Sequence, residues 1–227
     1  MPRTRIKICG LTRAEDIQAV VAAGADAIGF VFYPKSPRYV TPAQAAALIA
    51  AMPPYVTTVG LFVNATVEEV RATRAVAPLS LLQFHGDETP EHSAALAWAV
   101  NTPFTQVFRV KPDTSREDLL EYEQRYRAAS PLFASLLLDT YVDAYGGAGK
   151  VFDWSLIPEE LAPRVVLSGG LSVQNATDAV VRVRPYAVDI SSGVEASKGI
   201  KDASRVRAFI AAVQDADAII ARGNHHE

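Results

Sequence analysis

Short apolar runs alternate with amphipathic stretches along most of the chain. The runs are rich in Val, Ile, Leu and Phe, the composition of parallel strands that are covered on both faces. Between the runs, apolar residues recur at helical spacing, as in Ala45, Leu48, Ile49 and Met52. The pattern predicts strands at residues 6–9, 27–32, 56–62, 79–84, 104–110, 133–138, 165–167 and 187–190, with a helix after each.

Helix-start signals fall where this alternation requires them. Thr41 and Thr89 each precede a proline, which suits the first position of a helix. Thr66 and Glu69 have the spacing of a capping box. Ser115 and Ser172 stand at the predicted starts of two further helices. Local and periodic signals therefore predict the same element boundaries.

Eight consecutive β-then-α units indicate an α/β protein that forms a single (β/α)8 TIM barrel. An open, doubly wound sheet is the alternative that the pattern alone allows. No break in composition marks a linker, so we expect one catalytic domain over residues 1–215. Residues 216–227 are interpreted as a disordered C-terminal tail, in which His225 and His226 are not metal ligands.

Composition narrows the class of protein. The 227 residues are 49% hydrophobic and 21% charged, with a net charge of -3, so no basic field for nucleic acid or an anionic membrane is expected. No apolar run approaches the roughly 18 residues that a membrane helix needs, and no signal peptide precedes the first strand. The lone cysteine, Cys9, fits a reducing compartment, so we expect a cytoplasmic protein.

Reactive residues of such a barrel lie at the carboxyl ends of its strands and in the loops that follow. The loops after strands seven and eight contain small residues, which let backbone amides approach a phosphate closely. A glycine-rich turn can also be only a turn, but two of them lie at the usual phosphate position of these barrels. The predicted phosphate-binding residues are Gly169, Gly170, Ser192 and Gly193.

Strand alternation places Lys7 and Cys9 on one face of the first strand and the isoleucines on the other. Because helices cover the isoleucines, Lys7 and Cys9 should point into the barrel. The same alternation turns Asp189 inward, and closure makes the last strand the neighbour of the first. We therefore predict an ion pair between Lys7 and Asp189, either direct or bridged by a water molecule. The Lys7 ammonium should favour the Cys9 thiolate, although a buried cysteine can also be an inert hydrophobe.

Three other residues at strand ends or in the following loops have two interpretations each. Asp139 ends an apolar strand and either caps the next turn or acts as a general acid. Arg38 is either a solvated surface charge or a clamp for a carboxylate or phosphate. His85 is either a structural loop residue or a catalyst. Tyr33, Tyr39 and Trp154 are interpreted as packing residues, and no metal site or cofactor-binding motif is found.

Nine short runs contain most of the candidate residues: KICGLT at 7–12, GFVF at 29–32, SPR at 36–38, LQFHGDE at 82–88, LDT at 138–140, GGAGKVFDW at 146–154, LSGGL at 167–171, DISSGVE at 189–195 and KGIKD at 198–202. These runs resemble the motifs of the phosphoribosylanthranilate isomerases, enzymes of tryptophan biosynthesis. They follow the expected order, one at nearly every strand end, and span residues 7–202. Two positions depart from the family pattern, since Ala148 replaces an expected threonine and Phe84 an expected leucine.

The resemblance implies an Amadori rearrangement of N-(5'-phosphoribosyl)anthranilate without a cofactor. By position, Cys9 corresponds to the general base and Asp139 to the general acid. Arg38, His85 and Asp189 are the expected substrate-binding residues, with Arg38 at the anthranilate end. The only partner expected is this small-molecule substrate, and the chain is either a monomer or a homodimer.

Two other classes remain as alternatives. The first is another sugar-phosphate barrel enzyme, such as an indole-glycerol phosphate synthase or the related histidine-pathway isomerase. The histidine-pathway enzyme is expected to have an aspartate where this chain has Cys9, which argues against it. The second is a non-catalytic phosphate-binding barrel, which should lack the acid or the base.

Overall fold

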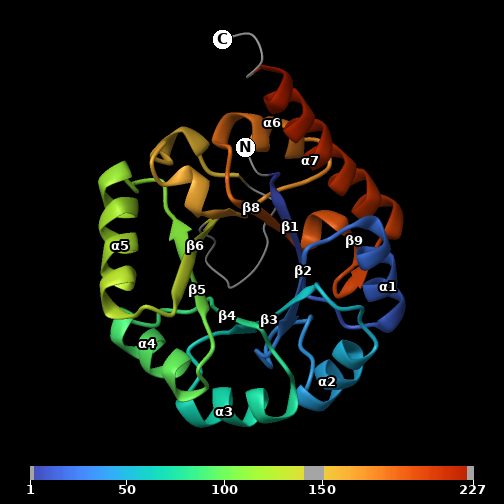
Figure 1. Cartoon of the computed structure of the whole chain (residues 1–227), viewed down its shortest axis with the longest axis vertical. Coiled ribbons are helices and arrows are strands. Elements are labelled where there is room, and N and C mark those ends of the chain that lie inside the picture. Colours follow the sequence, from blue (N-terminus) through green and yellow to red (C-terminus); the bar gives the residue numbers. More distant parts are fainter. Residues whose placement is uncertain (1–2, 141–150, 224–227) are drawn as a thin grey trace.

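The computed structural model describes residues 3–140 and 151–223. Its eight parallel strands close into a barrel in the order β1 to β8, and Figure 1 looks down the barrel with the helices around it. The predicted (β/α)8 barrel is confirmed, and the open sheet is ruled out because all eight strands, including the first and the last, pair with two neighbours. The strands are β1 (Arg5–Cys9), β2 (Ala27–Val31), β3 (Thr57–Phe62), β4 (Leu81–Phe84), β5 (Phe104–Val110), β6 (Phe133–Thr140), β7 (Val166–Leu167) and β8 (Ala187–Ile190).

Seven α-helices lie within the described ranges, and most begin where the capping signals predicted. The Thr41 and Thr66 side chains both accept from the third helical amide and complete capping boxes, and Thr89 and Ser115 also cap their helices. The helices are α1 (Ala14–Ala23), α2 (Pro42–Ala50), α3 (Val67–Val76), α4 (Pro90–Ala99), α5 (Arg116–Ala129), α6 (Ala176–Val183) and α7 (Ala203–Gly223).

Two local predictions are wrong. Ser172 does not cap α6, because residues 172–175 form a turn in which the Ser172 carbonyl accepts from the amides of Asn175 and Ala176. The helix therefore begins one turn later. Between β6 and β7, the described residues 151–165 contain two short 3-10 helices, η1 (Trp154–Leu156) and η2 (Ala162–Arg164), in place of an α-helix. Pro158 and Pro163 interrupt this segment, and proline removes the backbone donor that a continuous helix needs.

The last helix extends further than the sequence analysis predicted. Residues 216–223, assigned to a disordered tail, belong to α7. Ala216 is fully buried, and the Asp217 carboxylate accepts hydrogen bonds from the Thr4 amide at 2.9 Å and the Thr4 hydroxyl at 2.7 Å. These contacts join the end of α7 to the start of β1. His225 and His226 lie outside the described residues.

Aromatic packing on the outer face of the barrel accounts for one departure from the family pattern. The Phe84 ring lies between those of Phe62 and Phe104, with centroid distances of 6.4 Å and 5.5 Å. The series continues to Phe133 at 5.6 Å from Phe104. All four rings are nearly or completely buried between strands and helices. Phe84 therefore continues a row of aromatic rings across β3 to β6, which stabilises the sheet–helix interface.

A small antiparallel hairpin lies between β8 and α7 and was not predicted. It comprises β9 (Glu195–Ser197) and β10 (Ile200–Lys201), and it follows a 3-10 turn, η3 (Ser192–Val194). Its strands are too short to produce a recognisable periodic signal. In Figure 1 the hairpin is drawn beside α1, next to the barrel. No helix in the described ranges has the length and apolar character needed to span a membrane.

Candidate active site

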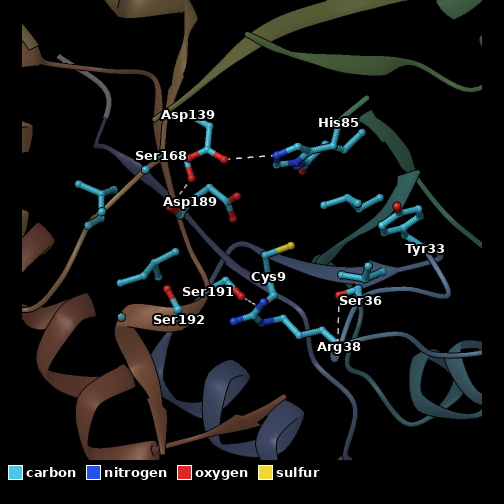
Figure 2. Close-up of a pocket in the computed structure, with 18 of the residues that line it drawn as sticks. Cys9, Tyr33, Ser36, Arg38, His85, Asp139, Ser168, Asp189, Ser191 and Ser192 are labelled. Atoms are coloured by element: carbon cyan, nitrogen blue, oxygen red, sulfur yellow. Dashed lines mark hydrogen bonds and ion pairs between the residues drawn. The ribbon is translucent and has the colours of Figure 1, made fainter. Parts of the chain in front are cut away.

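A pocket opens at the carboxyl ends of the strands, where the sequence analysis placed the chemistry. It contains all nine predicted site residues, and Figure 2 shows many of them facing a common space. One side is apolar, formed by Val31, Leu61, Val63 and the ring of Tyr33 beside Cys9. Together with Leu171 and Ile190, polar residues and glycines line the rest of the pocket: Ser36, Arg38, Gln83, His85, Asp139, Ser168, Gly169, Gly170, Asp189, Ser191, Ser192 and Gly193.

The predicted ion pair between Lys7 and Asp189 is confirmed. Lys7 is directly opposite Asp189 in the β1–β8 register, and its ammonium lies 2.8 Å from the carboxylate. The two side chains are only 8% and 7% exposed. Burial opposes the charge on Lys7, but Asp189 and Cys9 outweigh it and raise the pKa of Lys7. The lysine therefore stays an ammonium beneath the pocket.

Cys9 stands at the end of β1 and contributes to the pocket. Gly29 on β2 makes room for it, because a Cβ at Gly29 would lie 2.7 Å from Sγ. Burial raises the pKa of Cys9, whereas the charge of Lys7 lowers it. The predicted effect of Lys7 on the pKa of Cys9 has the right sign, but burial outweighs it. The thiolate is consequently the minority form at neutral pH.

Asp139, at the end of β6, is held by its neighbours. The Thr140 amide donates to Oδ1 at 2.8 Å, and His85 Nε2 lies 3.3 Å from Oδ2 (Figure 2). The Gln83 amide nitrogen lies 3.3 Å from His85 Nδ1. Since that nitrogen can only donate, Nδ1 accepts and Nε2 carries the hydrogen directed at Asp139. His85 thus holds the Asp139 carboxylate in place, and this contact was not predicted from the sequence.

Gly169 allows the backbone after β7 to pass close to Asp139. Its φ of +80° lies in the left-handed region, and a Cβ there would lie 2.9 Å from Asp139 Oδ1. Gly170 also has a positive φ of +68°. Residues with side chains rarely adopt this conformation, so glycine is required where the loop turns beneath the pocket. Together with Ser192 and Gly193, these glycines contribute small residues to one end of the pocket.

Arg38 is not a solvated surface charge. Its side chain is 14% exposed and binds Glu195 in a two-pronged ion pair, with distances of 2.7 Å and 2.8 Å. The Arg38 amide also donates to the Ser36 hydroxyl at 3.1 Å. The predicted clamp for a substrate anion is therefore already joined to an internal carboxylate. Glu195 ends the DISSGVE motif, but no local signal in the sequence links it to Arg38, which lies 157 positions earlier.

Several residues differ from their expected placement. Tyr33 was expected to be packing alone but lines the pocket, as does Ser168, whose hydroxyl donates to the Asp189 carbonyl at 3.1 Å. Tyr39 is 38% exposed, and Trp154 packs against the core. The motif residues 146–150 lie outside the described residues. In the part of the chain that is described, no group of three or more His, Cys, Asp and Glu side chains could hold a metal ion.

Comparisons with known proteins agree on one family. A family model described as N-(5'phosphoribosyl)anthranilate (PRA) isomerase matches residues 6–212. The N-(5'-phosphoribosyl)anthranilate isomerase of Herminiimonas arsenicoxydans is 71% identical over 218 residues, covering 96% of each chain. That of Methylibium petroleiphilum is 57% identical, covering 96% of this chain and 98% of its own.

Solved structures give the same result. A crystal structure of phosphoribosyl anthranilate isomerase in complex with reduced 1-(o-carboxyphenylamino)-1-deoxyribulose 5-phosphate is 37% identical, with a TM-score of 0.78. The similarity covers 93% of this chain and 99% of that one. The isomerase from Thermotoga maritima is 40% identical, with a TM-score of 0.79 and the same coverage.

Proposed function

The chain belongs to the N-(5'-phosphoribosyl)anthranilate isomerase family, and on this premise we propose that Cys9 and Asp139 perform the proton transfers of its reaction. That reaction is the Amadori rearrangement of N-(5'-phosphoribosyl)anthranilate to 1-(2-carboxyphenylamino)-1-deoxyribulose 5-phosphate, a step of tryptophan biosynthesis. The observation that carries the proposal is the placement of Cys9 and Asp139 in one pocket, on β1 and β6.

The first step requires an acid. Asp139 donates a proton to the ring oxygen of the ribofuranose, the C1'–O bond breaks, and the anthranilate nitrogen forms a Schiff base with C1'. Its support is the position of the carboxyl group, held by the Thr140 amide and by His85 at the edge of the pocket. These contacts fix the direction from which the proton is delivered, which favours transfer in a reactive geometry.

The second step requires a base. The Cys9 thiolate removes the C2' proton, the electron pair moves to form the C1'–C2' double bond, and the Schiff-base nitrogen becomes an amine. The resulting enolamine then gains a proton at C1' and loses the proton of its C2' hydroxyl, which gives the ketone product. Lys7 supports this role because its buried ammonium favours the thiolate. The sequence of steps balances without any redox partner.

The two ends of the substrate suit the two ends of the pocket. We place its phosphate against the backbone of Gly169, Gly170, Ser192 and Gly193. The aromatic ring then lies against the apolar side, and its carboxylate faces the guanidinium of Arg38. The Asp189 carboxylate oxygen that is not paired with Lys7 accepts a hydrogen bond from a ribose hydroxyl. His85 contacts the substrate beside Asp139.

A coupled fluorescence assay tests the assignment. N-(5'-phosphoribosyl)anthranilate is generated in situ and the loss of its fluorescence is followed. We expect rapid loss with the wild type, and a kcat lower by about 10²–10⁴-fold in Cys9→Ala and in Asp139→Asn. Binding of the reduced product analogue should change little in either variant. A variant that turns over at a near-normal rate would remove that residue from its role.

Two broader properties are also inferred. We infer that the protein works in the cytoplasm, because a single free cysteine suits a reducing compartment. We also infer that it is a monomer or a homodimer, without a macromolecular partner such as nucleic acid or a membrane. Analytical ultracentrifugation over a range of concentrations distinguishes the two oligomeric states.

A further inference from the structure

A buried charge cluster lies beside the pocket, and two of its three members have no role in the proposed function. It consists of Arg38, Glu195 and Lys201, which we call the hairpin cluster because two of its members lie on β9 and β10. The Glu195 and Lys201 side chains are 5% and 1% exposed, and Lys201 Nζ lies 3.0 Å from Glu195 Oε1. Glu195 therefore binds two cations at once, since it also holds Arg38.

Lys201 makes further contacts that reach the phosphate loop. Its ammonium donates to the Ser191 carbonyl at 3.1 Å and to the Ser191 hydroxyl at 3.3 Å. That hydroxyl in turn donates to the Cys9 carbonyl at 3.0 Å. Ser191 comes immediately before Ser192 and Gly193. One buried ammonium thus links the start of the phosphate loop, the end of β1 and the partner of Arg38.

The hairpin itself is fixed to the loop after β1 and to the first turn of α1. The Thr12 hydroxyl donates to the Gly199 carbonyl at 2.7 Å, and the Lys201 amide donates to the Asp16 carboxylate at 3.0 Å. The Gly199 amide donates to Glu195 Oε1 at 3.3 Å within the hairpin. These contacts make the hairpin a rigid support, so its two charged side chains hold their partners in defined places.

Removing this many charges from water costs free energy that the ion pairs return only in part, so stability alone is a weak explanation for the cluster. The cluster contains two cations and one carboxylate, and it lies next to a pocket proposed to take a substrate with a carboxylate and a phosphate. We propose that Glu195 and Lys201 are positioning residues, Glu195 for the Arg38 guanidinium and Lys201 for the phosphate loop at Ser191. The proposal rests on the proposed function for the identity of the two anionic ends.

The test uses two fragments and does not depend on turnover. Cys9 is the only cysteine, so its alkylation by iodoacetamide reports on the pocket alone. Anthranilate or ribose 5-phosphate in the pocket should slow this alkylation, and the concentration dependence gives a dissociation constant for each. The variants are Glu195→Gln and Lys201→Met, with Lys198→Met as the matched control, because it removes an exposed lysine from the same hairpin.

We expect the two fragments to respond separately. In Glu195→Gln, the guanidinium loses its two-pronged partner, so the dissociation constant of anthranilate rises by about tenfold or more and that of ribose 5-phosphate changes little. In Lys201→Met the pattern is reversed, because Ser191 loses its donor. Lys198→Met binds both fragments as the wild type does. In the isomerase assay, Glu195→Gln raises KM with little change in kcat.

Two outcomes overturn the proposal. One is wild-type binding of both fragments by both variants. The other is an equal loss of affinity for both fragments in each variant, which is the result expected if the two residues only stabilise the fold. If circular dichroism shows that Lys201→Met is unfolded, Lys201→Gln replaces it, because the glutamine side-chain amide can still donate hydrogen bonds but carries no charge. Failure of the proposed function is seen separately, as wild-type protein that binds the fragments but does not isomerise the substrate.

Discussion

Removal of the Lys7 ammonium should destabilise the protein strongly. Lys7→Met keeps the length and apolar stem of the side chain and removes the charge that faces Asp189 at 2.8 Å. Because both side chains are more than nine-tenths buried, solvent can do little to compensate the carboxylate left behind. A buried pair broken on one side typically costs about 3–5 kcal/mol of unfolding free energy. We expect a loss in this range.

Urea unfolding, followed by circular dichroism, measures the loss for Lys7→Met, Asp189→Asn and the double variant. Since each single change leaves its partner unpaired, the double variant should lose less than the sum of the two. The expected coupling energy is about 1–3 kcal/mol. Arg182→Met is the matched control, because Arg182 pairs with Asp178 at 2.6 Å but the two are 70% and 53% exposed. That change should cost less than about 1 kcal/mol.

The reasoning is refuted if Lys7→Met costs no more than Arg182→Met. It is also refuted if the losses of the two single variants simply add, because the pair would then contribute nothing as a pair. A third result would separate stability from reactivity: the expected loss of unfolding free energy and the expected coupling energy, but an unchanged rate of Cys9 alkylation in Lys7→Met. In that case Lys7 would support the fold without favouring the thiolate.

Two further changes test other parts of the structure. Gly29→Ala places a methyl group 2.7 Å from Cys9 Sγ, so we expect the unfolding free energy to fall by about 1–3 kcal/mol and kcat to decrease. Urea unfolding and the fluorescence assay measure the two effects. Wild-type values of both would mean that β2 shifts freely to accommodate the methyl group. Asp217→Ala removes both hydrogen bonds to Thr4 and should cost about 1–3 kcal/mol, whereas Asp215→Ala, at an exposed position of the same helix, should cost less than about 0.5 kcal/mol. Equal effects of the two aspartate changes would remove the role of the end of α7.

The barrel could be predicted because its signals are local and repeated. Each strand run has the composition of a covered parallel strand, and the caps at Thr41, Thr66, Thr89 and Ser115 depend on residues three positions away. The Lys7–Asp189 pair, although 182 positions apart, followed from alternation and closure alone. Regular geometry therefore brought together residues that are distant in the sequence.

Features without regular geometry could not be predicted. The pairing of Arg38 with Glu195 depends on the path of an irregular hairpin, and the contact of His85 with Asp139 depends on the side-chain rotamers of two residues near strand ends. The Ser172 error arose because a serine that caps a helix and one that opens a turn look the same in sequence. For Cys9, the sequence indicated the sign of the Lys7 effect but not the larger effect of burial.

The central claim is that the Cys9 thiolate is the base, and two pH profiles of the Asp139→Asn variant test it most directly, because no general acid then has to stay protonated and the base alone shapes the profile. Alkylation of Cys9 against pH reports ionisation of the thiol, and kcat/KM against pH reports the ionisation of the free enzyme's essential groups. Because burial raises the pKa of Cys9, both curves should rise together, with a midpoint above the pKa of an ordinary cysteine. If kcat/KM instead reaches its plateau at a pH where Cys9 is still unreactive, another group is the base.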